Sequence, residues 1–242
     1  MKTEKLSDTI TIINADCRDV LPVECAAVVT DPPYGCGCSY ASYDDTEANW
    51  FDLIHSTVPL IRKCGKCQVM PIGNRYAMGW WYENHAPDWL IAWHKGSPGH
   101  RSPIGFNDWE PMAVWGRPIR PMHDYFSTRC GFEDNGHPCP KPVEWASWLV
   151  NRVCEYAETV CDPFMGSGTT GIACIRARRR FIGIEKDAKY YEISKRRLND
   201  ELAQTNLFGE DEDARAGQGE CPGTACNSAS PKAAQISMEL EL

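Results

Sequence analysis

Long apolar runs are absent from this 242-residue chain, and basic residues are fewer than acidic ones. No segment of 18 consecutive apolar residues occurs, so the sequence predicts no membrane-spanning helix. The first residues, MKTEKLSDTITIINAD, lack the apolar core of a secretory signal peptide, which predicts a cytoplasmic protein. The 25 Lys and Arg against 33 Asp and Glu give a formal net charge of −8, an unexpected balance for a nucleic-acid-binding protein.

The negative charge is concentrated near the end of the sequence. Residues 208–242 contain seven acidic and two basic residues, a net charge of −5, and are rich in Gly, Ala and Ser. This composition predicts a disordered acidic tail. Residues 1–207 are expected to form one domain with a net charge of only −3, on which local basic patches can still contact phosphate.

The chain has no regular disulfide framework, although it contains 13 cysteines. Their odd number and the predicted cytoplasmic location indicate free thiols. A structural zinc site is the alternative, built from Cys36, Cys38, Cys64 and Cys67. Because only one residue separates Cys36 from Cys38, which is unusual for zinc, we expect no bound metal.

The hydrophobic pattern predicts an α/β domain. Short apolar runs bounded by turn residues predict strands that are covered on both faces, as in a parallel sheet. The runs occupy residues 9–16, 25–34, 66–73, 88–96 and 111–118, and helical spacing occupies 49–64 and 142–157. Residues 158–202 read as strand, Gly-rich turn, helix, strand, acid and helix, which is a βαβ unit followed by another helix. Residues 94–140 are rich in Pro, Gly, His and Arg and predict loops inserted into the scaffold.

The Gly-rich turn lacks both common phosphate-binding patterns. Gly166-Ser167-Gly168 has neither the third glycine of the dinucleotide fingerprint nor the lysine of a P-loop. Glu185 ends the next strand, a position from which a carboxylate accepts ribose hydroxyls. The unit therefore favours a nucleoside ligand without pyrophosphate, such as S-adenosylmethionine, and the alternative is a tight turn with a surface acid.

Two adjacent prolines occur in the hexapeptide TDPPYG, at residues 30–35. Each proline fixes its own φ angle, removes a backbone donor and disfavours helix in the residue before it. The segment is therefore predicted to be a stiff corner that holds the Asp31 carboxylate, the Pro32 carbonyl and the Tyr34 ring in fixed relation. The alternative is an ordinary loop that contains Pro-Pro.

Together these motifs resemble the DNA amino-methyltransferases that modify adenine N6 or cytosine N4. The resemblance covers about residues 9–200 and rests on DPPY, DPFMGSGTT, FIGIE, HPCPKPVEW and NADCRDVLP. The corner precedes the Gly-rich turn, which resembles the circularly permuted β group, and FNDWEPMAVWG is similar to a stretch of phage-type members. The resemblance implies a Rossmann-like S-adenosylmethionine-dependent methyltransferase fold with a small loop-rich insertion.

The resemblance also implies roles for particular residues. Asp31, Pro32, Pro33 and Tyr34 would hold the target amine: Asp31 and the Pro32 carbonyl accept its two N–H groups, Pro33 keeps the frame rigid and Tyr34 stacks on the base. The residues implied in binding S-adenosyl-L-methionine are Asp16, Lys141, Asp162, Phe164, Gly166, Ser167, Gly168, Thr169, Thr170 and Glu185. Cys139 and Pro140 replace the Thr and Gln of the family signature, so contacts made by those two side chains in relatives are not implied here.

Double-stranded DNA is the implied substrate, with the target base flipped out of the helix. Residues 94–130 are net positive and form the candidate target-recognition insertion, with a solvated loop as the alternative. The candidate DNA-binding residues are Lys95, Arg101, Arg117, Arg120 and Arg129. We expect the protein to act in a bacterial or phage-infected host cell, without binding a membrane or an obligate protein partner. Its oligomeric state is left open between a monomer and a homodimer.

Adenine N6 is favoured over cytosine N4 because Asp rather than Ser precedes the two prolines, which is a preference of the family rather than of the chemistry. Cytosine-N4 methylation is therefore the alternative. Methylation of a protein glutamine is less favoured, since those relatives carry Asn in place of Asp31. A non-catalytic DNA-binding homologue is also less favoured, because it would not need the intact corner.

Overall fold

The computed structural model describes residues 1–40, 42–73, 78–96, 101–102, 105–129 and 141–208. Met1–Leu207 form one compact unit, and Phe208–Leu242 form a second unit. Residues 209–242, for which the sequence predicts an acidic tail, lie outside the described residues. Within the described part of the chain, no helix combines the length and the apolar character needed to cross a membrane.

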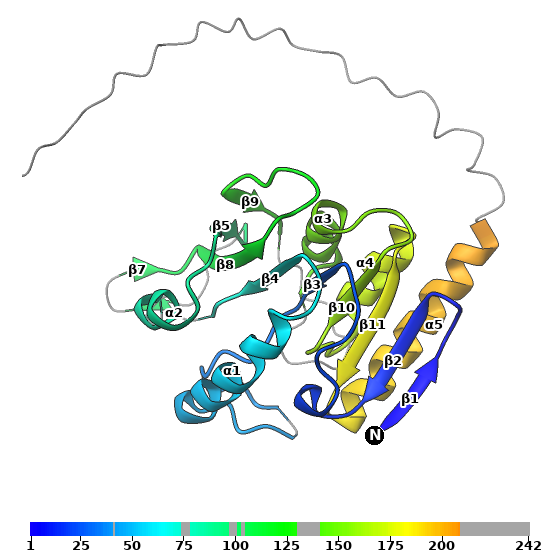
Figure 1. The fold of residues 1–242 in the computed structure, drawn as a ribbon, viewed down its shortest axis with the longest axis horizontal. Helices are drawn as coiled ribbons and strands as arrows, with labels where there is room; N and C mark the ends of the chain where they lie inside the picture. Colours follow the sequence, from blue (N-terminus) through cyan, green and yellow to red (C-terminus); the bar gives the residue numbers. More distant parts are fainter. Residues whose placement is uncertain (41, 74–77, 97–100, 103–104, 130–140, 209–242) are drawn as a thin grey trace, which may run out of the picture. The chain divides into compact units, whose positions relative to one another are not determined.

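A nine-stranded sheet forms the centre of the Met1–Leu207 unit, in the order β1-β2-β11-β10-β3-β4-β8-β5-β9 (Figure 1). Its strands are β1 (Lys2–Lys5), β2 (Ile10–Asn14), β3 (Ala27–Val29), β4 (Cys67–Pro71), β5 (Trp89–His94), β8 (Trp109–Gly116), β9 (Tyr125–Ser127), β10 (Thr159–Asp162) and β11 (Arg180–Glu185). The five strands from β2 to β4 in this order are parallel, whereas β8 is antiparallel to both of its neighbours. A separate two-stranded ladder pairs β6 (Arg101–Ser102) with β7 (Gly105–Phe106).

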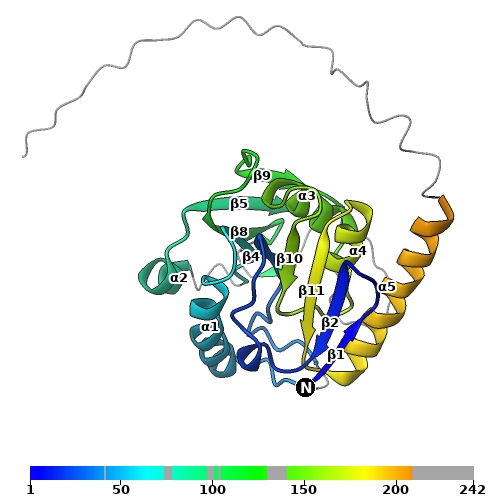
Figure 2. The ribbon, with the colours of Figure 1, turned by 45° about the vertical axis from the view of Figure 1, so that its right-hand side comes forward.

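Helices cover both faces of the sheet (Figures 1 and 2). On one face pack α1 (Glu47–Ile61) and α2 (Met78–His85), and a short 3₁₀ helix, η1 (Cys17–Asp19), lies on the same side. On the other face pack α3 (Val143–Val153), α4 (Thr169–Arg176) and α5 (Ala188–Phe208). Because successive strand residues point to opposite faces, Val28 joins the α1 cluster while Ala27 and Val29 join the α3 cluster. The strands and helices predicted from the apolar pattern are confirmed.

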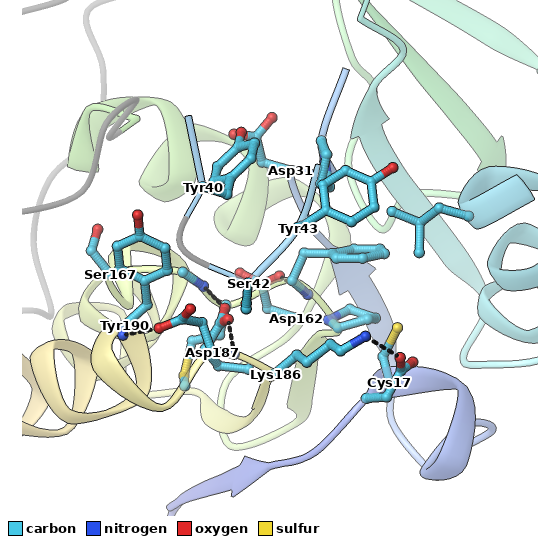
Figure 3. A pocket seen from close by; sticks show the side chains of 18 of the residues that line it. Cys17, Asp31, Tyr40, Ser42, Tyr43, Asp162, Ser167, Lys186, Asp187 and Tyr190 are labelled. Atoms are coloured by element: carbon cyan, nitrogen blue, oxygen red, sulfur yellow. Dashed lines mark hydrogen bonds and ion pairs between the residues drawn. The ribbon is translucent and has the colours of Figure 1, made fainter. Parts of the chain in front are cut away.

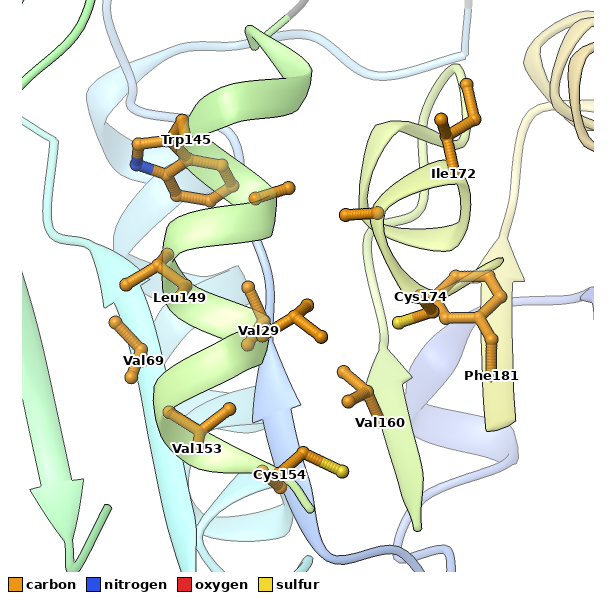
Figure 4. Close-up of a cluster of buried hydrophobic side chains, with 14 of the residues drawn as sticks. Val29, Val69, Trp145, Leu149, Val153, Cys154, Val160, Ile172, Cys174 and Phe181 are labelled. Carbon is orange, nitrogen blue, oxygen red and sulfur yellow. The ribbon is translucent and has the colours of Figure 1, made fainter. Parts of the chain in front are cut away.

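The apolar stripe of α3 lies at the centre of one core cluster. Trp145, Leu149 and Val153 follow at intervals of four residues and face Val29 and Val69 of the sheet (Figure 4). The helix begins directly after Pro142, whose φ of −63° suits the start of a helix. This packing fixes the position of the segment that leads into α3.

The strands β3 and β10 are parallel neighbours, but the chain leaves them toward opposite sides of the sheet. From β3 the chain passes through α1 to β4, and from β10 it passes through α4 to β11, with α1 and α4 on opposite faces. In open α/β sheets a crevice forms at the carboxyl ends of two such strands. The Pro-Pro corner follows β3 and the Gly-rich turn follows β10, so both lie at this crevice.

Part of the segment predicted as inserted loops is scaffold. β8 lies between β4 and β5 in the main sheet, and six of its eight residues are buried. The prediction of loops is therefore wrong for Trp109–Gly116, whereas the strand predicted at residues 111–118 is confirmed. Pro111 disfavours a central position for this predicted strand, but pairing with β4 on one side and β5 on the other stabilises it there.

Candidate active site

A cavity of about 310 Å³ opens at the carboxyl ends of β3 and β10 (Figure 3). Asp31 and Pro33 of the Pro-Pro corner line it, and so does the Gly-rich turn. Most of the residues predicted to bind the cofactor lie around it: Asp16, Lys141, Asp162, Phe164, Gly166, Ser167, Thr169, Thr170 and Glu185. The structure therefore brings the predicted catalytic corner and the predicted cofactor turn to one site.

Gly168 serves the packing of the turn. It caps the N-terminus of α4 with a φ of +84°, which glycine adopts without strain. A Cβ atom at this position would lie 3.1 Å from Ser194 Cβ in α5. The absence of a side chain thus allows the turn to approach α5 closely.

Glu185 presents a partly buried carboxylate to the cavity. Its Oε2 accepts a hydrogen bond from Gly166 N at 2.8 Å, and its Oε1 accepts one from Asp187 N at 2.8 Å. Burial raises the pKa of Glu185 to about 7, although these backbone hydrogen bonds oppose the shift. A carboxylate oxygen accepts more than one hydrogen bond, so both oxygens retain capacity for ligand hydroxyls.

Asp16, in contrast, is a carboxylate whose negative charge is paired with two cations, Arg18 and Lys186. Arg18 Nη2 lies 2.7 Å and Lys186 Nζ lies 3.1 Å from Asp16 Oδ2. Hydrogen bonds from Arg18 hold the pKa of Asp16 well below its usual range. Asp16 is therefore a fixed anion at the wall of the cavity.

Asp162 links the Pro-Pro corner to the Gly-rich turn through hydrogen bonds. Thr30 Oγ1, one residue before the corner, donates to Asp162 Oδ1 at 2.6 Å, and Phe164 N donates to the same oxygen at 3.1 Å. Both Thr30 and Asp162 are buried, and burial raises the pKa of Asp162 to about 6. The ends of β3 and β10 are thus tied together where the corner and the turn begin.

The Pro-Pro corner carries a dense hydrogen-bonded cluster. Tyr34 Oη contacts Asp31 Oδ1 at 2.5 Å, and it also contacts Glu110 Oε1 of β8. Lys141 Nζ lies 2.7 Å from Tyr34 Oη and 3.2 Å from Asp31 Oδ2. Burial and the Glu110 charge raise the pKa of Asp31 against the opposing effect of Lys141. Lys141, predicted as a cofactor residue, therefore lies against the catalytic corner as well as the cavity.

The loop that follows the corner adds residues that the sequence did not single out. Tyr40, Ser42 and Tyr43 line the cavity together with Asp31 (Figure 3). Asp45 shapes this loop, because its buried carboxylate accepts hydrogen bonds from the backbone N–H groups of Gly35, Cys36 and Cys38. No local sequence signal identifies such residues, since their role depends on how the loop folds back.

The cavity suits a ligand that donates and accepts hydrogen bonds. Tyr43 Oη is buried and has no hydrogen-bond partner among the described residues. The remaining acceptor capacity of Glu185 on the cavity wall fits a nucleoside with free ribose hydroxyls. The volume falls at the small end of the range for pockets that bind small molecules, roughly 300–1,000 Å³.

The five candidate DNA-binding residues lie at different places. Lys95 and Arg129 follow β5 and β9, whose carboxyl ends lie at the same end of the sheet as the corner. Arg117 and Arg120 follow the opposite end of β8, near Lys66 and Arg152, and the structure does not bring them to the cavity. Arg101 lies in β6, and its side chain is outside the described atoms.

The candidate zinc cysteines do not assemble into a recognisable metal site in the described structure. Cys36 is exposed and Cys38 partly exposed in the loop after the corner, whereas Cys64 and Cys67 are buried where α1 leads into β4. Among the described residues, no group of three or more His, Cys, Asp or Glu is arranged to hold a metal ion.

The three-layer fold and this crevice define a class of protein, the Rossmann-like methyltransferases. The structure resembles that of M1.HpyAVI in complex with SAM, with a TM-score of 0.58 and 26% identity over 78% of this chain and 99% of that one. It also resembles PvuII DNA methyltransferase, which is cytosine-N4-specific, with a TM-score of 0.61 and 17% identity over 84% of this chain and 94% of that one. The predicted fold class is confirmed.

Sequence comparison leads to the same class. Residues 107–196 match the model of the N6_N4_Mtase family, described as DNA methylase. The chain is 40% identical over 95 residues to the type II methyltransferase M2.LlaDCHI of Lactococcus lactis subsp. cremoris, covering 39% of this chain and 33% of that protein. It is 41% identical over 64 residues to M2.MboI of Moraxella bovis, covering 26% of this chain and 23% of that protein. The chain is thus similar to DNA amino-methyltransferases, although each alignment spans only a third or less of the curated relative.

Proposed function

We propose that this protein is a DNA methyltransferase that transfers a methyl group from S-adenosyl-L-methionine to the exocyclic N6 of adenine. The observation that carries the proposal is the shared cavity, in which Asp31 and Pro33 of the corner and Glu185 of the cofactor side line one space. The motif order, with the corner before the Gly-rich turn, favours the permuted β group within the family. The stretch around β8 favours a phage-type member.

The cofactor side of the cavity is built from Glu185, the Gly-rich turn and Asp16. Glu185 accepts the ribose hydroxyls, and the backbone of Gly166 and Ser167 allows close approach. When bound, S-adenosyl-L-methionine supplies an electrophilic methyl group on a positively charged sulfur.

The corner increases the reactivity of the target amine. Asp31 and the Pro32 carbonyl accept its two N–H groups, which favours the pyramidal nitrogen on which positive charge develops. The nitrogen–methyl bond forms as the sulfur–methyl bond breaks, the sulfur keeps the electron pair, and the amine loses one proton. Because the pKa of Asp31 is raised by burial, its carboxylate is a better acceptor for that proton than an exposed aspartate.

DNA is proposed to approach the carboxyl ends of the parallel strands, where the cavity opens. Lys95 and Arg129 lie at this edge and can contact phosphate. Exposed aromatic side chains occur at the same edge, with Phe106 58% and Trp109 40% exposed, and they offer stacking surfaces for bases. A base inside a duplex cannot reach Asp31, so the target base must be flipped out of the helix.

Transfer of a labelled methyl group to unmethylated DNA tests the proposal. After digestion to nucleosides, we expect label in N6-methyladenine. Label in N4-methylcytosine would establish the second candidate, because the corner accepts the two N–H groups of either amine. Label in a protein substrate but not in DNA would contradict both.

Asp31→Ala is expected to abolish methyl transfer while leaving cofactor affinity nearly unchanged. The reason is that Asp31 faces the target amine, whereas Glu185 and the Gly-rich turn provide the cofactor contacts. Calorimetric titration of the variant with S-adenosyl-L-methionine checks this expectation. A loss of cofactor binding as large as the loss of activity would contradict the assignment of Asp31.

A further inference from the structure

Glu110 is a buried carboxylate that the sequence motifs leave without a role. It lies on β8 beneath the corner, with a side chain only 7% exposed. Lys95 Nζ lies 3.2 Å from its Oε2, and Lys141 Nζ lies 3.5 Å from its Oε1. Although burial opposes ionisation, these two lysines and the Tyr34 hydroxyl lower the pKa of Glu110, so the carboxylate is charged.

The Tyr34 hydroxyl is shared between two carboxylates. It contacts Asp31 Oδ1 at 2.5 Å and Glu110 Oε1, and Lys141 Nζ donates to it at 2.7 Å. A phenol carries a single proton, and burial with two adjacent carboxylates raises the pKa of Tyr34 well above its usual value, so that proton stays on it. Tyr34 can therefore donate to only one of the two acids at a time.

This competition matters for the proposed reaction, because Asp31 must accept an N–H group of the target amine. Lys141 already occupies Asp31 Oδ2 at 3.2 Å. If Tyr34 also donates to Oδ1, each Asp31 oxygen already accepts one hydrogen bond from the protein, which compensates its negative charge and makes it a weaker acceptor for the amine. When Tyr34 donates to Glu110 instead, Oδ1 keeps its full acceptor strength for the amine.

We infer that Glu110 is a positioning residue, which accepts the Tyr34 hydroxyl hydrogen bond in place of Asp31 and so keeps one Asp31 oxygen a strong acceptor for the target amine. The inference rests on the proposed methyl transfer. The charged and titratable groups that face the pair are Lys95, Lys141 and Tyr34, with Asp162 below Asp31.

The test is a double-mutant cycle of Glu110→Gln and Tyr34→Phe. Tyr34→Phe keeps the ring and removes the competing hydroxyl. We expect Glu110→Gln to lower kcat by about tenfold or more, the effect of one catalytic hydrogen bond, with cofactor affinity unchanged. The double variant is expected to recover activity toward that of Tyr34→Phe alone. A double variant no more active than Glu110→Gln would overturn the inference, since a merely structural role gives no such rescue.

A second readout uses the protein without cofactor or DNA. Loss of the Glu110 charge and gain of the Tyr34 hydrogen bond both favour ionised Asp31. Carbon-13 NMR titration should therefore show the apparent pKa of Asp31 falling by about one unit in Glu110→Gln. The Asp31 signal is assigned by its loss in Asp31→Asn, and an unchanged Asp31 titration would overturn the inference.

Two controls keep the outcomes separate. Glu201→Gln removes a carboxylate that is 11% exposed and paired with Arg176, away from the cavity, and should change neither readout.

If Glu110→Gln fails to fold, Lys95→Met replaces it. Removal of the Lys95 cation favours protonated Glu110, so this variant should lose more activity at acidic than at alkaline pH. Wild-type protein that transfers no methyl to DNA would contradict the proposed function itself, whereas an unchanged Asp31 titration in Glu110→Gln would contradict the role of Glu110 alone.

Discussion

Two carboxylates of the cavity differ in how their charge is compensated. Asp16 is held by Arg18 and Lys186, and its pKa lies well below the usual range. Glu185 receives two backbone N–H groups, and burial raises its pKa to about 7. Of the two, only Glu185 changes its charge near neutral pH, so it should make ligand binding depend on pH.

Cofactor affinity is expected to weaken as the pH falls below about 7, the folded-state pKa of Glu185. The ionised carboxylate accepts the ribose hydroxyls, and the pKa is raised, so the binding form is lost on the acidic side. The loss should approach tenfold per pH unit. Titration calorimetry from pH 5 to 8 measures it, and proton release on binding at pH 6.5 is the companion signal.

Glu185→Gln should remove most of that pH dependence. At pH 8 the variant is expected to bind the cofactor about 1–3 kcal/mol more weakly, the contribution of hydrogen bonds to a charged group. Any dependence that remains belongs to Asp162, whose pKa is about 6. Affinity equal to wild type at pH 8 would show that Glu185 does not touch the ribose.

The hydrogen bond between Thr30 and Asp162 connects the ends of two strands. Thr30→Val keeps the shape and removes the donor, so we expect a loss of about 1–2 kcal/mol in the free energy of unfolding. The corner should also become less fixed relative to the Gly-rich turn, so kcat should fall more than cofactor affinity does. Urea unfolding and steady-state kinetics check the two parts, and an unchanged kcat would show that the link is structural only.

Gly168→Ala tests the turn that begins α4. Its φ of +84° and the 3.1 Å approach to Ser194 Cβ predict a loss of about 1–3 kcal/mol in the free energy of unfolding. Gly79→Ala in α2 is the matched control, because a Cβ there meets nothing within 4 Å. That control should be neutral or stabilising by about 0.4–1 kcal/mol. Equal behaviour of the two variants in thermal unfolding would contradict the packing role of Gly168.

Elements with local signals could be predicted from the sequence, and elements that depend on distant partners could not. The apolar runs of β2, β3, β4, β10 and β11 predict strands because both faces are buried. β1 carries charged residues and exists through antiparallel pairing with β2, so no apolar run identifies it. The apolar run at residues 111–118 predicts the strand β8, but its place between β4 and β5 could not be predicted, because Pro111 disfavours a central strand and both partners come earlier in the chain.

The same distinction applies to the site. The corner and the Gly-rich turn are visible as motifs because each is one continuous segment. Glu110 has no such signal, since its contacts come from Tyr34 and Lys141, which precede and follow it at a distance in the chain. The candidate basic residues lie at both ends of the strands, and this could not be predicted either. The net charge of a segment does not specify where in the fold each of its side chains lies.

Charge is distributed unevenly over the whole chain. Of the formal net charge of −8, residues 208–242 contribute −5. The buried residues of both core clusters lie between Ile10 and Leu198. The final segment therefore contributes negative charge, while the core that stabilises the fold precedes it.

Deletion of residues 209–242 is expected to leave the melting temperature and the activity nearly unchanged. Removal of negative charge should tighten DNA binding by about two- to fivefold at low salt, and less at physiological salt because of screening. Fluorescence anisotropy at two salt concentrations measures the effect. Aggregation or loss of activity in the shortened protein would show that this segment packs on the body.

The parallel pairing of β2 with β11 has a consequence for biosynthesis. Asn14 and Glu185, joined by a hydrogen bond from Asn14 Nδ2 at 2.8 Å, are 171 residues apart in sequence. When β2 leaves the ribosome, its inner edge has no partner until β11 has been made, and an unpaired apolar strand is prone to aggregate. Nascent chains stalled before Arg180 should therefore be sensitive to protease and bound by chaperones, whereas chains released after α5 should become resistant only slowly, as expected for a sheet closed by its most distant strands.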